Sequence, residues 1–176
     1  MNYIFKSARL GFRAFNKNDA EAFYNNHNEE KFKQWFPGNE CEDIEEALEE
    51  IDFFRGCVND KVLPYVLAIE LLETSELIGD TGANEVEGKN NEVEIGFSIC
   101  EKHQGFGYAT EAVIAMSKFI MQVFPVKKLY GRVLKGNDVS CKILQKSGYK
   151  YKAIEMEAED DPYGNGMLVY VRTKYA

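Results

Sequence analysis

The 176-residue sequence is poor in the side chains that build metal sites and disulfide frameworks. It has four cysteines and two histidines, and no two cysteines form a Cys-x-x-Cys pair. The histidines, His27 and His103, stand too far from each other and from the cysteines to complete a zinc pattern. We therefore expect reduced, mostly buried thiols and no bound metal.

Long apolar runs and an excess of positive charge are missing as well. No apolar stretch approaches about 18 residues, and residues 1–6 lack the apolar core of a signal peptide. We therefore expect a cytoplasmic protein that does not enter a membrane. The 21 lysines and arginines against 29 aspartates and glutamates give a net charge of −8. Because binding to phosphate backbones needs basic patches, we do not expect a nucleic-acid partner.

The chain does contain enough apolar material for one packed core. Hydrophobic residues make up 45% of the sequence and charged residues 28%, which are the proportions of an ordinary globular chain. No repeat, low-complexity tract or Pro/Gly/Ser-rich linker divides it. Length and composition predict a single domain over residues 1–176.

Hydrophobic periodicity predicts strands and helices in a mixed order. Alternating or continuous apolar segments predict strands at 9–15, 65–72, 76–86, 92–100, 128–134, 149–158 and 167–173. Helical spacing predicts about four helices, at 16–28, 42–58, 109–124 and 140–146. This order predicts a mixed α/β (α+β) sheet with too few crossovers for a doubly wound fold.

The most informative segment joins the predicted strand at 92–100 to the helix at 109–124. It has the sequence Gln-Gly-Phe-Gly-Tyr-Ala-Thr-Glu-Ala at 104–112. Glycines allow a ligand to approach the backbone, and a helix start presents free N–H groups, so the segment favours a phosphate ligand. A glycine-rich turn that only caps the helix stays open. A dinucleotide motif needs a third glycine where Thr110 stands, and there is no Walker loop.

Residues 104–109 match the Q/R-x-x-G-x-G/A signature of the GNAT acetyltransferases. Further matches stand in order along the chain: Arg-Leu-Gly-Phe-Arg-Ala-Phe at 9–15, Glu-Ile-Gly-Phe at 94–97, Asn-Asp-Val-Ser at 137–140 and Lys-Ser-Gly-Tyr at 146–149. The sequence therefore resembles this family over residues 8–173. The opening motif is similar to that of the RimJ/RimL-like branch of ribosomal-protein N-acetyltransferases.

The resemblance implies a GNAT fold, with a mostly antiparallel mixed sheet in which the strands at 92–100 and 128–134 splay apart. It implies acetyl-CoA as co-substrate, an amine as acceptor and a homodimer. Pantetheine would bind backbone groups of Phe97, Ser98 and Ile99. Pyrophosphate would bind the signature residues Gln104, Gly105, Phe106, Gly107, Tyr108, Ala109 and Thr110. Asn137 would bond the acetyl-bearing arm, and Lys142 a CoA phosphate.

The implied reaction is direct attack of a neutral amine on the thioester in a ternary complex. Making an α-amine neutral at pH 7 costs about 1 kcal/mol, against about 4.6 kcal/mol for a lysine side chain. We therefore expect a protein N-terminal α-amine as acceptor. A small amine (polyamine, amino acid or antibiotic) and a non-catalytic acyl-CoA-binding module stay open as alternatives.

Two side chains are candidates for moving protons. Glu94 is the expected proton acceptor, with Glu92 and Glu85 as rivals. Many family members have a tyrosine acid at the position of Leu144, so we expect Ser140 to protonate the leaving thiolate instead, although a helix-capping role stays open for its hydroxyl. The acidic segment at 155–161 is either a solvated edge or an attraction for a cationic acceptor.

Overall fold

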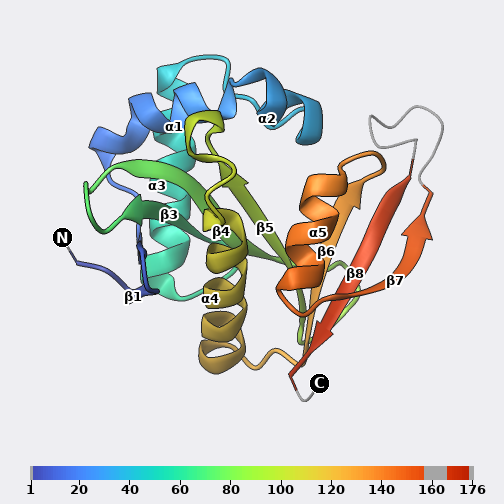
Figure 1. The fold of residues 1–176 in the computed structure, drawn as a ribbon. Coiled ribbons are helices and arrows are strands. Elements are labelled where there is room, and N and C mark those ends of the chain that lie inside the picture. The colour runs from blue at the N-terminus through green and yellow to red at the C-terminus, as the bar shows by residue number, and fades with distance from the viewer. Residues whose placement is uncertain (1, 157–165, 175–176) are drawn as a thin grey trace.

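The computed structural model describes residues 2–156 and 166–174, which contain one eight-stranded sheet and five α-helices (Figure 1). The strands are β1 (Phe5–Lys6), β2 (Leu10–Arg13), β3 (Tyr65–Leu71), β4 (Leu77–Glu85), β5 (Glu92–Ile99), β6 (Lys128–Leu134), β7 (Lys150–Glu155) and β8 (Met167–Thr173). The helices are α1 (Ala20–His27), α2 (Glu30–Trp35), α3 (Ile44–Asp60), α4 (Tyr108–Val123) and α5 (Asp138–Lys146). Two 3-10 turns, η1 (Lys17–Asp19) and η2 (Glu101–His103), precede α1 and α4.

The sheet confirms the expected splay between its middle strands. The strand order is β1-β2-β3-β4-β5-β6-β8-β7, and β5 with β6 is the one parallel pair among the described strands. Their pairing covers three residues of each strand, from Glu92 opposite Lys128 to Glu94 opposite Tyr130. Beyond that point β6 continues its pairing with β8, so β5 and β6 diverge (Figure 1).

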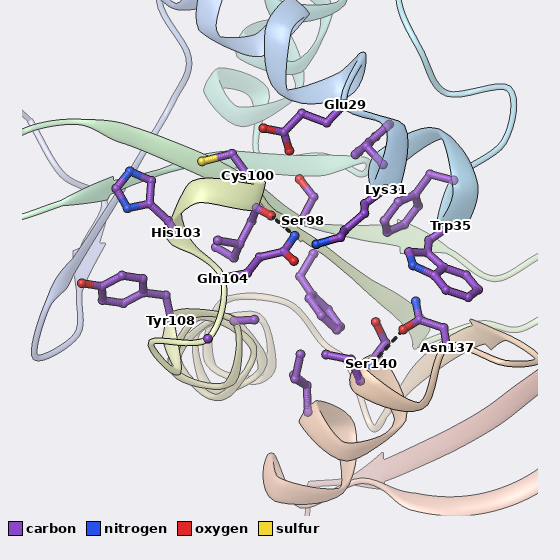
Figure 2. Close-up of a pocket in the computed structure, with 18 of the residues that line it drawn as sticks. Glu29, Lys31, Trp35, Ser98, Cys100, His103, Gln104, Tyr108, Asn137 and Ser140 are labelled. Carbon is purple, nitrogen blue, oxygen red and sulfur yellow. Dashed lines mark hydrogen bonds between the residues drawn. The ribbon is translucent and has the colours of Figure 1, made fainter.

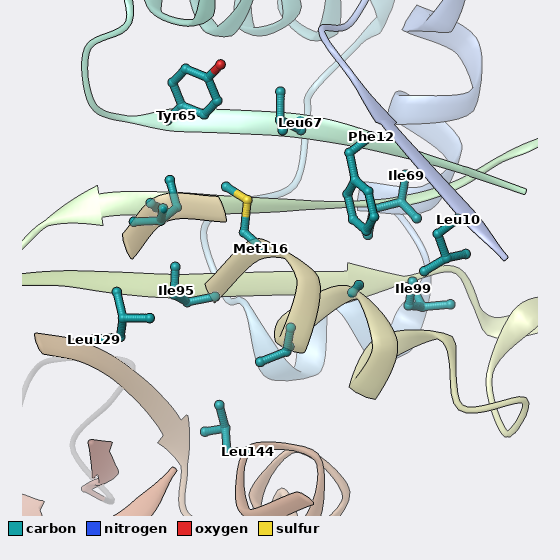
Figure 3. Close-up of a cluster of buried hydrophobic side chains, with 14 of the residues drawn as sticks. Leu10, Phe12, Tyr65, Leu67, Ile69, Ile95, Ile99, Met116, Leu129 and Leu144 are labelled. Carbon is teal, nitrogen blue, oxygen red and sulfur yellow. The ribbon is translucent and has the colours of Figure 1, made fainter. Parts of the chain in front are cut away.

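Side chains of β3 alternate between two cores on opposite faces of the sheet. Leu67 and Ile69 pack in the same cluster as Met116 of α4 (Figure 3). Val66 and Ala68 pack on the other face, with residues of α1 and α3. The sheet is therefore a middle layer, which explains why β3 is buried along its whole length.

The structure adds two elements that the sequence patterns do not predict, β1 and α2, so the expectation of about four helices falls one short. Six residues are too few for a clear helical period, and α2 buries none of its side chains fully. Contacts with η2 hold it instead: Lys31 Nζ lies 3.3 Å from Glu101 Oε2, and Glu29 Oε2 accepts the Glu101 N–H at 2.8 Å.

The other boundaries lie close to those predicted. The first strand ends at Arg13 rather than at 15, because Asn16 caps the η1 turn. The predicted strand at 149–158 ends at Glu155, and its last two residues lie outside the described part of the chain. Among the described residues, the helices all lack the combination of length and apolar character that crossing a bilayer requires.

Candidate active site

A cavity of about 570 Å³ opens where β5 and β6 separate (Figure 2). Its walls are the end of β5, the loop leading into α4, the start of α5, and α2. Most of the predicted site residues line it: Phe97, Ser98, Ile99, Gln104, Gly105, Gly107, Tyr108, Ala109, Thr110, Asn137 and Ser140. The fold therefore brings together three motifs that are separate in the sequence.

The signature loop has the backbone geometry of an anion site. Gly105 and Gly107 have φ angles of 84° and 83°, a left-handed conformation that residues with a Cβ rarely adopt. Gly107 is the N-cap of α4 and supplies no side-chain cap, so the first-turn N–H groups are left for a ligand. Tyr108, Ala109 and Thr110 carry these groups and line the cavity.

Arg9 holds this loop in place, a role that sequence reasoning missed. Its Nη1 donates to the Phe106 carbonyl oxygen at 3.0 Å, and its guanidinium lies over the Tyr108 ring at 4.5 Å. Its Nε pairs with Glu111 Oε2 at 2.7 Å in the first turn of α4. Arg9 and Glu111 both lie in segments singled out from the sequence, at 9–15 and 104–112. A single sequence does not show, however, that two residues 102 positions apart are in contact.

The end of β5 offers backbone groups to the cavity. The ladder to β6 stops at Glu94, so the β6 side of the strand is unpaired by the sheet from Ile95 onward. Gln104 Nε2 donates to the Ile99 carbonyl oxygen at 2.8 Å and ties the signature loop to the end of the strand (Figure 2). This edge has the position that the resemblance implies for the pantetheine arm.

Asn137 and Ser140 meet at the start of α5 (Figure 2). Asn137 Oδ1 accepts the Ser140 N–H at 3.1 Å and caps the helix. The cap is therefore Asn137, which leaves the Ser140 hydroxyl for the cavity. Leu144 is fully buried, with side-chain carbons 2.7 Å from where a Cβ on Gly131 would stand. The position of the usual family tyrosine thus points into the core.

Three predicted site residues are not among those that line the cavity: Glu94, Phe106 and Lys142. The Phe106 side chain is exposed and stacks on the Tyr108 ring, and its carbonyl accepts the hydrogen bond from Arg9. Lys142 is exposed on α5, whereas Lys146 lies one turn further along the helix and does line the cavity.

Glu94 is held in an ion pair. Its Oε2 lies 2.6 Å from Arg132 Nη1, and Arg132 Nε lies 2.9 Å from Glu155 Oε2. Burial raises the pKa of Glu94, and the charge of Arg132 opposes that rise. In contrast, the hydrogen bond from Lys128 Nζ lowers the pKa of the rival Glu92. Of these two carboxylates, Glu94 is the one whose pKa is raised, and a raised pKa suits a proton acceptor at neutral pH.

The helix α2 forms one wall of the cavity. Phe32, Trp35 and Phe36 line the cavity. A Cβ on Gly136 would stand 4.0 Å from the Trp35 ring, so α2 reaches across to the loop before α5 (Figure 2). Their spacing at i, i+3 and i+4 is the signal that places them on one helix face.

Behind the β5 wall lies a polar cluster formed by the buried His27 and the half-buried Asp80 and Ser98. His27 Nε2 lies 3.0 Å from Asp80 Oδ2, and Ser98 Oγ donates to the same oxygen at 3.0 Å. Ligand-capable atoms of His27, Cys41 and Glu50 lie within 4.8 Å of one another. This proximity could not be read from the spacing of the three residues in the sequence, and the expectation of no bound metal stays a prediction.

Most of the acidic segment at 155–161 lies outside the described residues.

The family model of the acetyltransferase (GNAT) domain matches residues 9–150 of the chain. Over 174 residues the chain is 24% identical to the uncharacterized N-acetyltransferase YoaA of Bacillus subtilis (strain 168), covering 97% of this chain and 98% of that protein. A solved GNAT acetyltransferase from Bacillus anthracis has a TM-score of 0.83 at 20% identity, covering 97% of this chain and 98% of the other.

Two further solved structures share the fold. RimL, a ribosomal L7/L12 α-N-protein acetyltransferase in complex with CoA, has a TM-score of 0.80 at 16% identity and covers 98% of each chain. A spermidine N-acetyltransferase from Vibrio cholerae, in complex with CoA and spermine, has a TM-score of 0.79 at 18% identity, covering 96% of this chain and 98% of that one. With the family model matching most of the sequence, the chain belongs to the GNAT family of acetyltransferases.

Proposed function

We propose that the protein transfers the acetyl group of acetyl-CoA to the N-terminal α-amine of another protein. The observation that carries the proposal is the cavity itself, which joins a glycine-rich helix start, an unpaired strand edge and a capped helix start. The first suits a pyrophosphate, the second an extended amide arm, and the third the thioester end.

Each part of the donor has a proposed partner. The first-turn N–H groups of α4 would bind the pyrophosphate, and the edge at Phe97–Ile99 would pair with the pantetheine amides. Because Asn137 Oδ1 caps α5, the Asn137 Nδ2 group is the one that would donate to the acetyl-bearing arm. Lys142 remains the predicted partner of a CoA phosphate.

The acceptor is proposed from the free energy of deprotonation. An α-amine needs about 1 kcal/mol to be neutral at pH 7, and a lysine amine about 4.6 kcal/mol. Glu94 remains the predicted proton acceptor. Its raised pKa supports that role, while its ion pair with Arg132 competes with it. Ser140 remains the predicted acid for the thiolate, supported by its place in the cavity wall.

The acceptor class is tested with three substrates at equal acetyl-CoA: a peptide with a free N-terminus, the same peptide blocked at the N-terminus but carrying lysine, and spermidine. The proposal predicts the highest kcat/KM for the free N-terminus. A higher value for spermidine would assign the alternative small-amine function, which the fold of the Vibrio cholerae spermidine N-acetyltransferase supports. Binding of acetyl-CoA without turnover of any amine would assign a non-catalytic module.

The proton donor is tested with Ser140→Ala. We expect kcat to fall while the KM for acetyl-CoA is unchanged, because the hydroxyl would act on the leaving group and the cap comes from Asn137. A turnover rate that Ser140→Ala leaves unchanged across the pH range would remove serine from the mechanism.

A further inference from the structure

The Ser98 hydroxyl donates its hydrogen to Asp80, which is not among the residues that line the cavity. Ser98 and Asp80 are directly opposite each other in the β4–β5 ladder, and Ser98 Oγ donates to Asp80 Oδ2 at 3.0 Å. A serine hydroxyl has one hydrogen and two lone pairs. Since that hydrogen goes to Asp80, the hydroxyl has only lone pairs to offer a ligand in the cavity that Ser98 lines.

His27 keeps Asp80 in this arrangement. His27 Nε2 lies 3.0 Å from the Asp80 Oδ2 atom that Ser98 uses, and Nδ1 lies 3.4 Å from the Asn39 carbonyl oxygen. The ring packs against Phe23 and Phe32, with centroid separations of 3.8 Å and 4.2 Å. The imidazole therefore has a polar partner at each ring nitrogen and two aromatic rings packed against it, and it fixes the carboxylate in turn.

The titratable groups that face the imidazole are Asp80, Cys41 and Glu50. Burial raises the pKa of Cys41 to about 12, so this thiol is neutral. Burial also raises the pKa of Glu50, an effect that the His27 charge opposes. The hydrogen bond that Ser98 Oγ donates to Asp80 Oδ2 keeps the Ser98 hydrogen on the Asp80 side.

The ligand that meets Ser98 follows from the geometry of the strand. Backbone groups at the β5 edge lie in the plane of the sheet, whereas side chains project out of it. The proposed pantetheine contacts use the edge, but Ser98 projects toward the side of Asp80 and α1. On that side the cavity wall is α2, with Trp35 (Figure 2) and with Phe32, whose ring stacks on His27. This is the side left for the amine.

We propose that Ser98 Oγ accepts a hydrogen bond from the N–H of the acceptor amine and so turns the amine lone pair toward the thioester carbon. This inference rests on the proposed function. Asp80 and His27 act as positioning residues, because they hold the Ser98 hydrogen away from the amine. The Ser98 side chain thereby gains a role toward the acceptor, in addition to the backbone contact expected toward CoA.

The kinetic test compares Ser98→Ala with Ser98→Thr, which keeps the hydroxyl. One hydrogen bond of ordinary strength is expected to lower kcat/KM for the amine about 5–10-fold in Ser98→Ala, and Ser98→Thr should restore most of it. The KM for acetyl-CoA should not change, and the loss should be the same at every pH. Asp80→Asn should reproduce the loss, and the double variant with Ser98→Ala should be no worse than either single variant.

Asp60→Asn, an exposed charge change at the end of α3, is the matched control and should leave kcat/KM unchanged. A wild-type rate in Ser98→Ala would overturn the inference, as would a loss expressed in the KM for acetyl-CoA. A loss that disappears as pH rises would also overturn it, because that behaviour belongs to a proton acceptor rather than to a positioning hydroxyl.

A binding measurement separates this inference from the proposed function. Alanine amide is titrated calorimetrically into the protein saturated with CoA, where no reaction occurs. Weaker binding to Ser98→Ala than to wild type and Ser98→Thr supports the contact, even if no amine is turned over and the transfer proposal fails. Equal binding to all three proteins would overturn the contact and leave the transfer proposal standing.

Discussion

Replacing Gly107 with alanine tests whether the helix start of α4 is a built anion site. Gly107 has φ of 83° and is the N-cap of α4. A Cβ at this position would lie 3.6 Å from Arg9 Nη2, which is ordinary van der Waals contact. The substitution therefore causes no steric clash, and its cost comes from backbone conformation alone.

The expected magnitude follows from that conformation. Holding a residue with a Cβ in the left-handed region costs about 1–2 kcal/mol, which lowers the Tm of a chain of this size by about 2–8 °C. If the loop relaxes instead, at least one first-turn N–H would lose the phosphate contact proposed for it. A hydrogen bond to a charged group is worth about 1.5–3 kcal/mol, so the Kd for acetyl-CoA should rise about 10–100-fold.

Gly56→Ala is the matched control, because Gly56 lies in α3 with no atom within 4 Å of an added Cβ. It should raise stability by about 0.5–1 kcal/mol, through helix propensity, without affecting Kd. Thermal melts followed by circular dichroism and calorimetric titration with acetyl-CoA measure both quantities. A Gly107→Ala protein with wild-type Tm and wild-type Kd would refute the proposed role of this backbone geometry.

Three further predictions follow from contacts outside the loop. Arg9→Ala should weaken acetyl-CoA binding in calorimetric titrations and leave kcat at saturation intact, since Arg9 anchors the Phe106 carbonyl and Glu111. Leu144→Ala should cost about 2–5 kcal/mol in denaturant unfolding, because the side chain is fully buried against Gly131. Burial raises the pKa of Glu50, so its contribution to stability is present below its ordinary pKa of 4.5 and is lost as pH rises through the folded-state value. Glu50→Gln should therefore raise Tm at pH 7 relative to wild type, and that gain should disappear in melts at pH 4.

Periodicity predicted the fold well where elements are long. The four predicted helices all exist, and the motifs at 94–97, 104–109 and 137–140 converge on one cavity. These motifs are local, since each specifies its own turn or helix start. Gly107 shows why this works: a glycine before a helix predicts both the left-handed cap and the free N–H groups.

Long-range partners could not be predicted in the same way. Arg9 and Glu111 meet through the packing of the chain start on α4. Asp80 meets Ser98 through sheet register, and it meets His27 through the packing of α1 against β4. The helix α2 was missed because contacts with η2, rather than its own six residues, stabilise it. Glu94 was placed on the correct strand, but its ion pair with Arg132 depends on the parallel pairing of β5 with β6.

The most direct test of the account counts the products of one reaction. Acetyl-CoA and a peptide with a free N-terminus are incubated with the protein, released thiol is measured, and the acetylated position is determined by mass spectrometry. Direct transfer to an N-terminal amine predicts one thiol for each acetyl group and acetylation at the α-amine. Thiol release without an acetylated peptide, or acetylation confined to lysine side chains, would contradict it.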